Sequence, residues 1–172
     1  MSTLRSDLVT QIGKTAYEHE RVYHGCSQCV LSALQDHLGL GSRDSFKAAT
    51  ALAGGIARMG ETCGALVGGI MGISLAFGRD RLEDATTSQG YARAMDLGGE
   101  LCKRFGAALG STQCRDIQRS LFGRSFDLRD PRERQEFRKA GGYDKCPQVA
   151  QRAAELAATV ILEAGFAGDG QA

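Results

Sequence analysis

Apolar residues recur at every third and fourth position along most of this 172-residue chain. The longest such pattern runs from Tyr91 to Leu109 and predicts one helix over residues 88–109. This spacing places side chains on one face of an α-helix, whereas a half-buried strand alternates at every second residue. Composition agrees, because the helix formers Ala and Leu number 40 together while the β-branched Val and Ile number 12. The sequence therefore predicts an all-α fold, a compact bundle of about six to eight helices.

Glycines and capping residues divide this pattern into separate helices. Gly25 ends the first helix, the Gly39-Leu40-Gly41 run closes the second, and Ser42 and Asp44 are candidate N-caps of the third. The predicted helices cover residues 3–21, 26–38, 44–57, 62–78, 88–109, 113–121, a short helix beginning at Pro131, and 147–163. We expect the helix over 88–109 to be central, residues 122–144 to be the most exposed region, and residues 168–172 to form a disordered tail. The length and the absence of a linker-like segment predict a single domain over residues 1–172.

The charge distribution excludes several classes of partner. Lys and Arg number 21 against 20 Asp and Glu, so the net charge of +1 supplies no field for nucleic acid or anionic lipid. Arg5, Asp7 and Lys14 interrupt the segment where a signal peptide would need an apolar core. The longest uncharged run, residues 62–78, contains five glycines and is predicted to be a buried helix rather than a membrane span. We therefore expect a cytoplasmic protein with no nucleic-acid or membrane partner.

Six cysteines in such a chain indicate metal binding or thiol chemistry rather than a disulfide framework. Four of them are predicted to lie at helix N-termini. They are Cys26, Cys63, Cys114 and Cys146, the last as an N-cap before Pro147. Free backbone N–H groups and the helix dipole stabilise a thiolate at such a position, and a thiolate is both a metal ligand and a redox nucleophile. We predict these four as metal ligands, with Cys26 and Cys63 as the catalytic redox residues.

The remaining residues near these four cysteines divide into candidate site residues and packing residues. Gly64 and Gly68 are candidate cofactor-binding positions, because a residue without a side chain lets a cluster or a sulfur approach the backbone. Close helix packing also explains Gly68. Cys29 and Cys102 are predicted to be small buried hydrophobic residues. Among the histidines only His24, two residues before Cys26, is a candidate neighbour of the site.

The order of these residues resembles that of a known family. The chain carries Gly25-Cys26-Ser27-Gln28 before Val30-Leu31, then Thr62-Cys63-Gly64-Ala65-Leu66-Val67-Gly68, then Phe105-Gly106 before Cys114-Arg115, and finally Cys146. Over residues 16–162 it resembles the C_GCAxxG_C_C family of redox-active proteins. The resemblance implies a redox role for the matching cysteines. Similar domains accompany haem in split-Soret-type cytochromes, where the cysteine-bearing part is associated with an iron centre. Cys29 and Cys102 are not required by the family's pattern.

The Cys26-Ser27-Gln28-Cys29 motif is a CxxC, but Val30 follows it, which excludes c-type haem attachment. The motif is also similar to the CxxC of the all-helical alkyl hydroperoxidase D-like proteins. The proton relay of those proteins uses a Glu upstream of the motif and a His four residues after its second Cys. In this chain Glu18 or Glu20 could serve as the Glu, but the position of the His is Ala33. That relay is therefore incomplete.

Three functions remain open from the sequence. The first is electron transfer or redox sensing through an iron–sulfur cluster or another thiolate-bound metal at Cys26, Cys63, Cys114 and Cys146. The second is a metal-free thiol–disulfide oxidoreductase that uses Cys26 with Cys29 or with Cys63. The third is a structural Cys₄ zinc site. If the protein is an enzyme, it is an oxidoreductase. We expect an unidentified redox protein as its partner, and the Ala- and Gly-rich helix faces can accommodate a homodimer.

Overall fold

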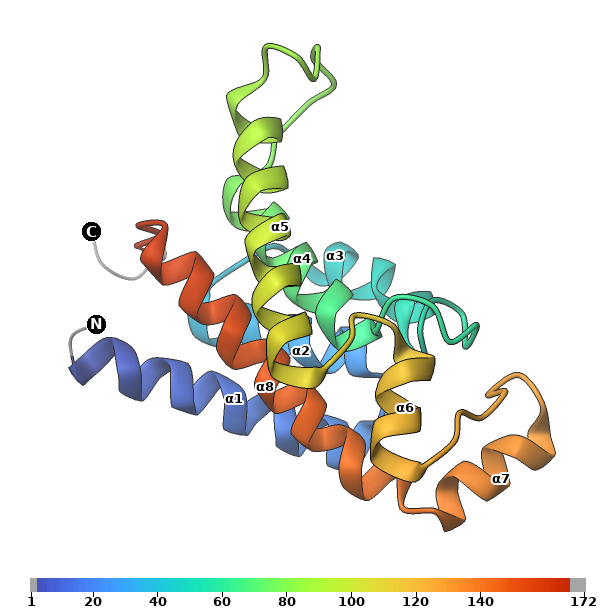
Figure 1. The fold of residues 1–172 in the computed structure, drawn as a ribbon. Coiled ribbons are helices and arrows are strands. Elements are labelled where there is room, and N and C mark those ends of the chain that lie inside the picture. The colour runs from blue at the N-terminus through green and yellow to red at the C-terminus, as the bar shows by residue number, and fades with distance from the viewer. Residues whose placement is uncertain (1–2, 168–172) are drawn as a thin grey trace.

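The computed structural model describes residues 3–167, which form eight α-helices, one 3₁₀ helix and no β-strand (Figure 1). The α-helices are α1 Thr3–Tyr23, α2 Cys26–Leu38, α3 Arg43–Ala48, α4 Gly64–Phe77, α5 Gln89–Leu109, α6 Cys114–Phe122, α7 Pro131–Lys139 and α8 Gly142–Glu163, and the 3₁₀ helix η1 is Thr50–Leu52. The all-α prediction is confirmed. The predicted tail, residues 168–172, lies outside the described residues. Within residues 3–167, no helix is both long enough and apolar enough to cross a bilayer.

Helix α8 is the central helix of the bundle. It contacts α1, α2, α4, α5 and α7, and its alanines are buried on the faces that meet these neighbours. Because alanine side chains are short, several helices can approach α8 closely. The prediction that residues 88–109 are central is wrong: α5 buries only Gly98, Leu101 and Phe105, and Met95 is 59% exposed.

Helices α2 and α4 cross at very short range. A Cβ atom at Gly68 would lie 2.3 Å from the carbonyl oxygen of Ser27, and one at Gly72 would lie 2.5 Å from Cδ1 of Leu34. Only glycine permits this approach, because real Cβ contacts are never so short. The crossing places the first turns of α2 and α4 next to each other.

Two predicted helices have different bounds in the structure. The third helix stops at Ala48 instead of residue 57, and η1 follows it before a turn of unusual conformation. The last helix begins at Gly142, after Gly141 with a φ of 81°. Pro147 therefore lies inside α8, where its missing N–H removes one intrahelical hydrogen bond. Cys146 is consequently not an N-cap.

The segment over residues 122–144 is less exposed than its polar composition predicts. Phe126 and Phe137 are 8% and 5% exposed, and their ring centroids lie 5.6 Å apart at a steep angle. Phe122 and Tyr143 extend this edge-to-face cluster to α6 and α8. The cluster attaches α7 to the bundle and forms one wall of the site described next.

Candidate redox site

Four cysteines from four different elements line one cavity of about 610 Å³. Cys26 is the first residue of α2, Cys63 is the N-cap of α4, Cys114 is the first residue of α6, and Cys146 lies in the second turn of α8. None of them is in a disulfide bond. Three of the four thus begin or cap a helix as predicted, while Cys146 reaches the cavity from inside one.

A single antiparallel bridge brings Cys63 and Cys114 to the same edge of the cavity. The bridge joins Thr62 to Gln113, the residues directly before the two cysteines. The Cys63 N–H donates to the Thr112 carbonyl at 2.8 Å, and the Cys114 N–H donates to the Glu61 carbonyl at 2.7 Å. The N-termini of α4 and α6 are therefore held side by side, although they are far apart in sequence.

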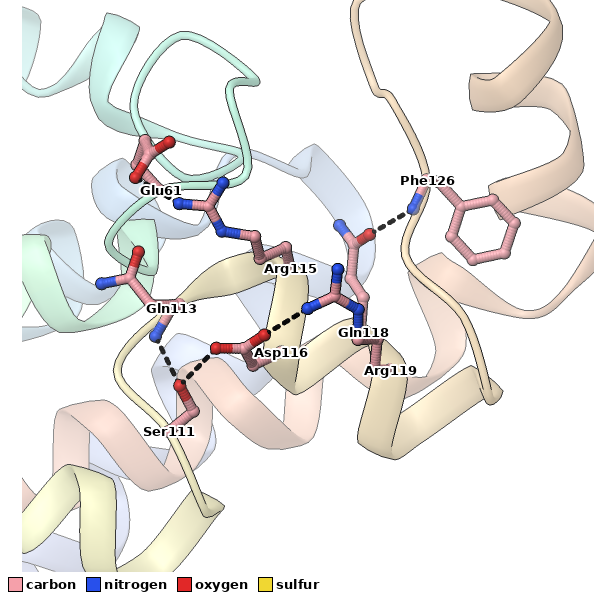
Figure 2. Close-up of polar contacts among 8 residues, drawn as sticks. All are labelled: Glu61, Ser111, Gln113, Arg115, Asp116, Gln118, Arg119 and Phe126. Atoms are coloured by element: carbon pink, nitrogen blue, oxygen red, sulfur yellow. Dashed lines mark hydrogen bonds and ion pairs between the residues drawn. The ribbon is translucent and has the colours of Figure 1, made fainter.

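Polar side chains fix α6 in this position (Figure 2). Arg115 forms an ion pair with Glu61 at 2.6 Å, across the same junction as the bridge. At the next turn Gln118 accepts a hydrogen bond from the Phe126 N–H at 2.8 Å, and its amide nitrogen lies 3.5 Å from the Cys114 sulfur. These contacts tie Cys114 to both the α4 side and the α7 side of the cavity.

Gly64 provides the close approach that the sequence predicts beside Cys63. A Cβ atom there would lie 2.7 Å from the sulfur of Cys26 and 2.7 Å from the carbonyl oxygen of Leu52. Any other residue would displace one of these groups. Neither Gly64 nor Gly68 lines the cavity itself, and Gly68 packs on Ser27. Cofactor binding by either glycine stays a prediction.

The turn over residues 54–58 forms another wall of the cavity and is left-handed throughout. Its φ angles are 68° and 72° at two glycines and then 56°, 49° and 65° at Ile56, Ala57 and Arg58. A non-glycine residue in this region costs about 1–2 kcal/mol, and such strain persists only where the surroundings impose it. Hydrogen bonds such as Ala57 N–H to the Ala51 carbonyl, at 2.7 Å, hold the turn. Nothing in the local sequence signals it.

Burial determines the protonation of the four thiols. Burial raises the pKa of Cys63 to about 11, although the Ala65 and Leu66 N–H groups at the start of α4 act in the opposite direction. Burial also raises the pKa of Cys114 to about 12. Burial and nearby negative charges together raise the pKa values of Cys26 and Cys146 well above the usual range. The expectation that helix N-termini lower these pKa values is therefore wrong for the metal-free protein, because desolvation of a thiolate outweighs the dipole.

Glu20, which the sequence analysis named only with Glu18 as a possible proton-relay residue, is part of the site. It lines the cavity, is only 4% exposed, and its Oε2 atom has no hydrogen-bond partner among the described residues. Burial raises its pKa to about 7, and the nearby Cys29 thiol and Gly25 N–H offset this only in part. A signal was present, because the buried positions Ile12 and Ala16 of α1 recur every four residues and Glu20 continues them.

Of the remaining candidate residues, His24 lines the cavity and Cys29 and Cys102 do not. His24 lines it and stacks on Tyr143 with ring centroids 3.8 Å apart, as its place in the sequence suggested. Cys29 is 4% exposed and is not part of the cavity lining. Cys102 lies on α5, partly buried against the core and also outside the lining. Within residues 3–167, no three His, Cys, Asp or Glu side chains are close enough to hold one metal ion.

The convergence of Cys26, Cys63, Cys114 and Cys146 corresponds to the cysteine order of one family. A sequence model of the family described as "Putative redox-active protein (C_GCAxxG_C_C)" matches residues 24–160, which is most of the chain. The chain belongs to this family. No curated protein and no solved structure shows significant similarity to it.

Proposed function

We propose that this C_GCAxxG_C_C protein functions in electron transfer or redox sensing through an iron–sulfur cluster bound by Cys26, Cys63, Cys114 and Cys146. The observation that carries the proposal is the single cavity lined by these four sulfur-bearing residues from four helices. Thiolates are the usual ligands of such clusters. When bound, the cluster supplies a one-electron couple, and the protein holds it, orients it and limits its contact with water.

The donor set has the features that such a group needs. Backbone N–H groups lie near two of the sulfurs, from Gly54 at Cys26 and from Ala65 and Leu66 at Cys63. Hydrogen bonds to ligand sulfurs stabilise the thiolate form and help to set the reduction potential. Because the unligated thiols are neutral near pH 7, metal loading must release their protons and becomes more favourable as the pH rises.

A polynuclear group requires a less close convergence of its ligands than a single ion does. A tetrahedral zinc site requires four sulfurs at about 2.3 Å from one centre. No three candidate ligands of residues 3–167 meet so closely, although four cysteines face one cavity. A cluster joins ligands that are farther apart, because each thiolate binds a different metal atom.

A metal-free thiol–disulfide cycle is the second candidate, and one observation favours Cys26 with Cys63 as its pair. Both residues line the cavity, and the Cys26 sulfur packs against Gly64, the residue after Cys63. Cys29, the other possible partner of Cys26, is buried outside the cavity lining.

Anaerobic purification followed by metal, sulfide and spectroscopic analysis tests the proposal. We expect iron and acid-labile sulfide, together with broad visible absorption that dithionite bleaches. The Cys63→Ser variant should lose this absorption and retain its helicity, whereas the matched Cys102→Ser variant should retain both. A colourless protein with bound zinc, or a colourless metal-free protein that cycles between dithiol and disulfide, would refute the cluster.

A further inference from the structure

Helix α5 carries a second apolar face that its own fold covers only in part. The core face of α5 is formed by Gly98, Leu101 and Phe105. A separate line of residues, called here the outer stripe, runs about a quarter turn around the helix from this face, at alternating spacings of three and four. The outer stripe consists of Ala92, Met95, Gly99, Cys102, Gly106 and Leu109. This is the spacing of helices that pair along their length.

The outer stripe is open to solvent over its N-terminal half, whereas Cys102, Gly106 and Leu109 are half-buried. Met95 is 59% exposed, and a Cβ atom at Gly99 would have no atom within 4 Å. Tyr91, one turn before Met95, is also 37% exposed. In Figure 1, the N-terminal part of α5 and the loop before it extend beyond the rest of the bundle. Glycine and alanine in the stripe allow the backbone of a second helix to approach closely.

The charges along α5 separate into two groups. The first group has partners: Arg104 forms ion pairs with Glu100 and Glu163, each at 2.8 Å. Arg93 donates a hydrogen bond to the Ala164 carbonyl at 2.6 Å and lies over the Phe77 ring. Asp96 and Lys103 lie seven residues apart at one edge of the outer stripe. Both are exposed, and neither has an ion-pair partner within residues 3–167. The two unpaired charges have opposite signs.

We propose that two copies of this chain form a homodimer by pairing their α5 outer stripes in antiparallel orientation. In an antiparallel pair of helices the same edge of each helix meets, so Asp96 of one copy faces Lys103 of the other, and the two-fold symmetry repeats the contact. In a parallel pair this edge would face the opposite edge, which carries no charge complementary to Asp96. The charges of Asp96 and Lys103 therefore favour a second copy of this chain as the partner and an antiparallel orientation of the two α5 helices.

The interface is small, because it consists mainly of one helix from each copy. The outer stripe spans 17 residue steps, about 26 Å at the usual helical rise. A single pair of helices in contact over this length buries an area at the lower end of specific interfaces, so we expect the dimer to dissociate on dilution. This surface is on a different helix from the four cavity cysteines, and the inference does not depend on the redox proposal.

Sedimentation equilibrium over a concentration series, with a thiol reductant present, tests the dimer. We expect the full chain to associate from monomer to dimer. Asp96→Lys places a second ammonium group opposite Lys103, and Lys103→Asp places a second carboxylate opposite Asp96, so each variant should weaken association about tenfold or more. The matched control, Asp7→Lys on exposed α1, should associate like the unchanged protein.

An equimolar mixture of the two weakened variants decides the orientation. In the antiparallel heterodimer, the introduced lysine of one copy faces the introduced aspartate of the other. The remaining Lys103 of the first copy faces the remaining Asp96 of the second, so association should return to the level of the unchanged protein. Circular dichroism of each variant establishes that it is folded. A monomeric full chain at every concentration, single variants that associate normally, or a mixture that stays monomeric would each overturn the proposal.

Discussion

Replacing Glu20 by glutamine should stabilise the metal-free protein at alkaline pH. Glu20 is 4% exposed, its Oε2 atom has no hydrogen-bond partner among the described residues, and burial raises its pKa from 4.5 to about 7. The unfolded chain ionises this carboxyl without cost, whereas the native state must either keep its proton or bury a charge. A glutamine side chain has nearly the same size as that of glutamate and carries no charge at any pH.

The size of the effect follows from the difference between the two pKa values. Between pH 4.5 and 7 the native protein holds a proton that the unfolded chain has released, so the free energy of unfolding falls as the pH rises. Above pH 7 both states are ionised and the full penalty is present. At about 1.4 kcal/mol per pKa unit, this penalty is about 3 kcal/mol at pH 8 and below 1 kcal/mol at pH 5.

Urea denaturation between pH 5 and pH 8, with reductant and without metal, measures this effect. The free energy of unfolding of Glu20→Gln should exceed that of the unchanged protein by about 3 kcal/mol at pH 8, and the two should nearly agree at pH 5. The control is Glu18→Gln, because Glu18 has an exposed side chain and an ion pair with Arg21. It should follow the pH profile of the unchanged protein. Parallel profiles for Glu20→Gln and the unchanged protein would refute the argument.

Three further changes test the local geometry, and a labelling rate tests the role of burial. Gly64→Ala should destabilise the protein by about 1–3 kcal/mol, because the new Cβ meets the Cys26 sulfur and the Leu52 backbone. Gly98→Ala, whose Cβ meets only Ile70 at 3.9 Å, should instead stabilise it by up to about 1 kcal/mol in the same urea titration. Ala57→Gly should raise the melting temperature, because glycine adopts the φ of 49° without strain. Iodoacetamide should label Cys63 of the folded, metal-free protein about a hundredfold more slowly than Cys63 of the protein unfolded in urea, because burial raises its pKa from 9 to about 11. Mass spectrometry measures both labelling rates. Equal rates would contradict the role of burial.

Local sequence was enough to predict most of the helices. The spacing of apolar residues and the glycines at helix ends give α2 the predicted bounds, Cys26–Leu38, and place α4, α5 and α6 within two residues of the predictions. These signals act over a few residues, because a cap or a C-terminal glycine satisfies the backbone groups of its own helix. The family's cysteine order was readable for the same reason, as a pattern along the chain.

Tertiary contacts decided the features that the sequence analysis missed. The left-handed turn over residues 54–58 contains Ile56, Ala57 and Arg58, whose own preferences oppose it, so only the surrounding fold can hold it there. The start of α8 before Pro147 and the central position of α8 depend on packing against several helices.

The candidate redox site depends on both local sequence and tertiary contacts. The sequence by itself determined that Cys26, Cys63 and Cys114 stand at the beginnings of helices. The tertiary structure decided that they share a cavity with Cys146 and Glu20 and that burial raises the pKa values of their thiols in the metal-free protein. A helix dipole is a property of one segment, but desolvation depends on every segment packed around the thiol, and at these positions desolvation is the larger effect.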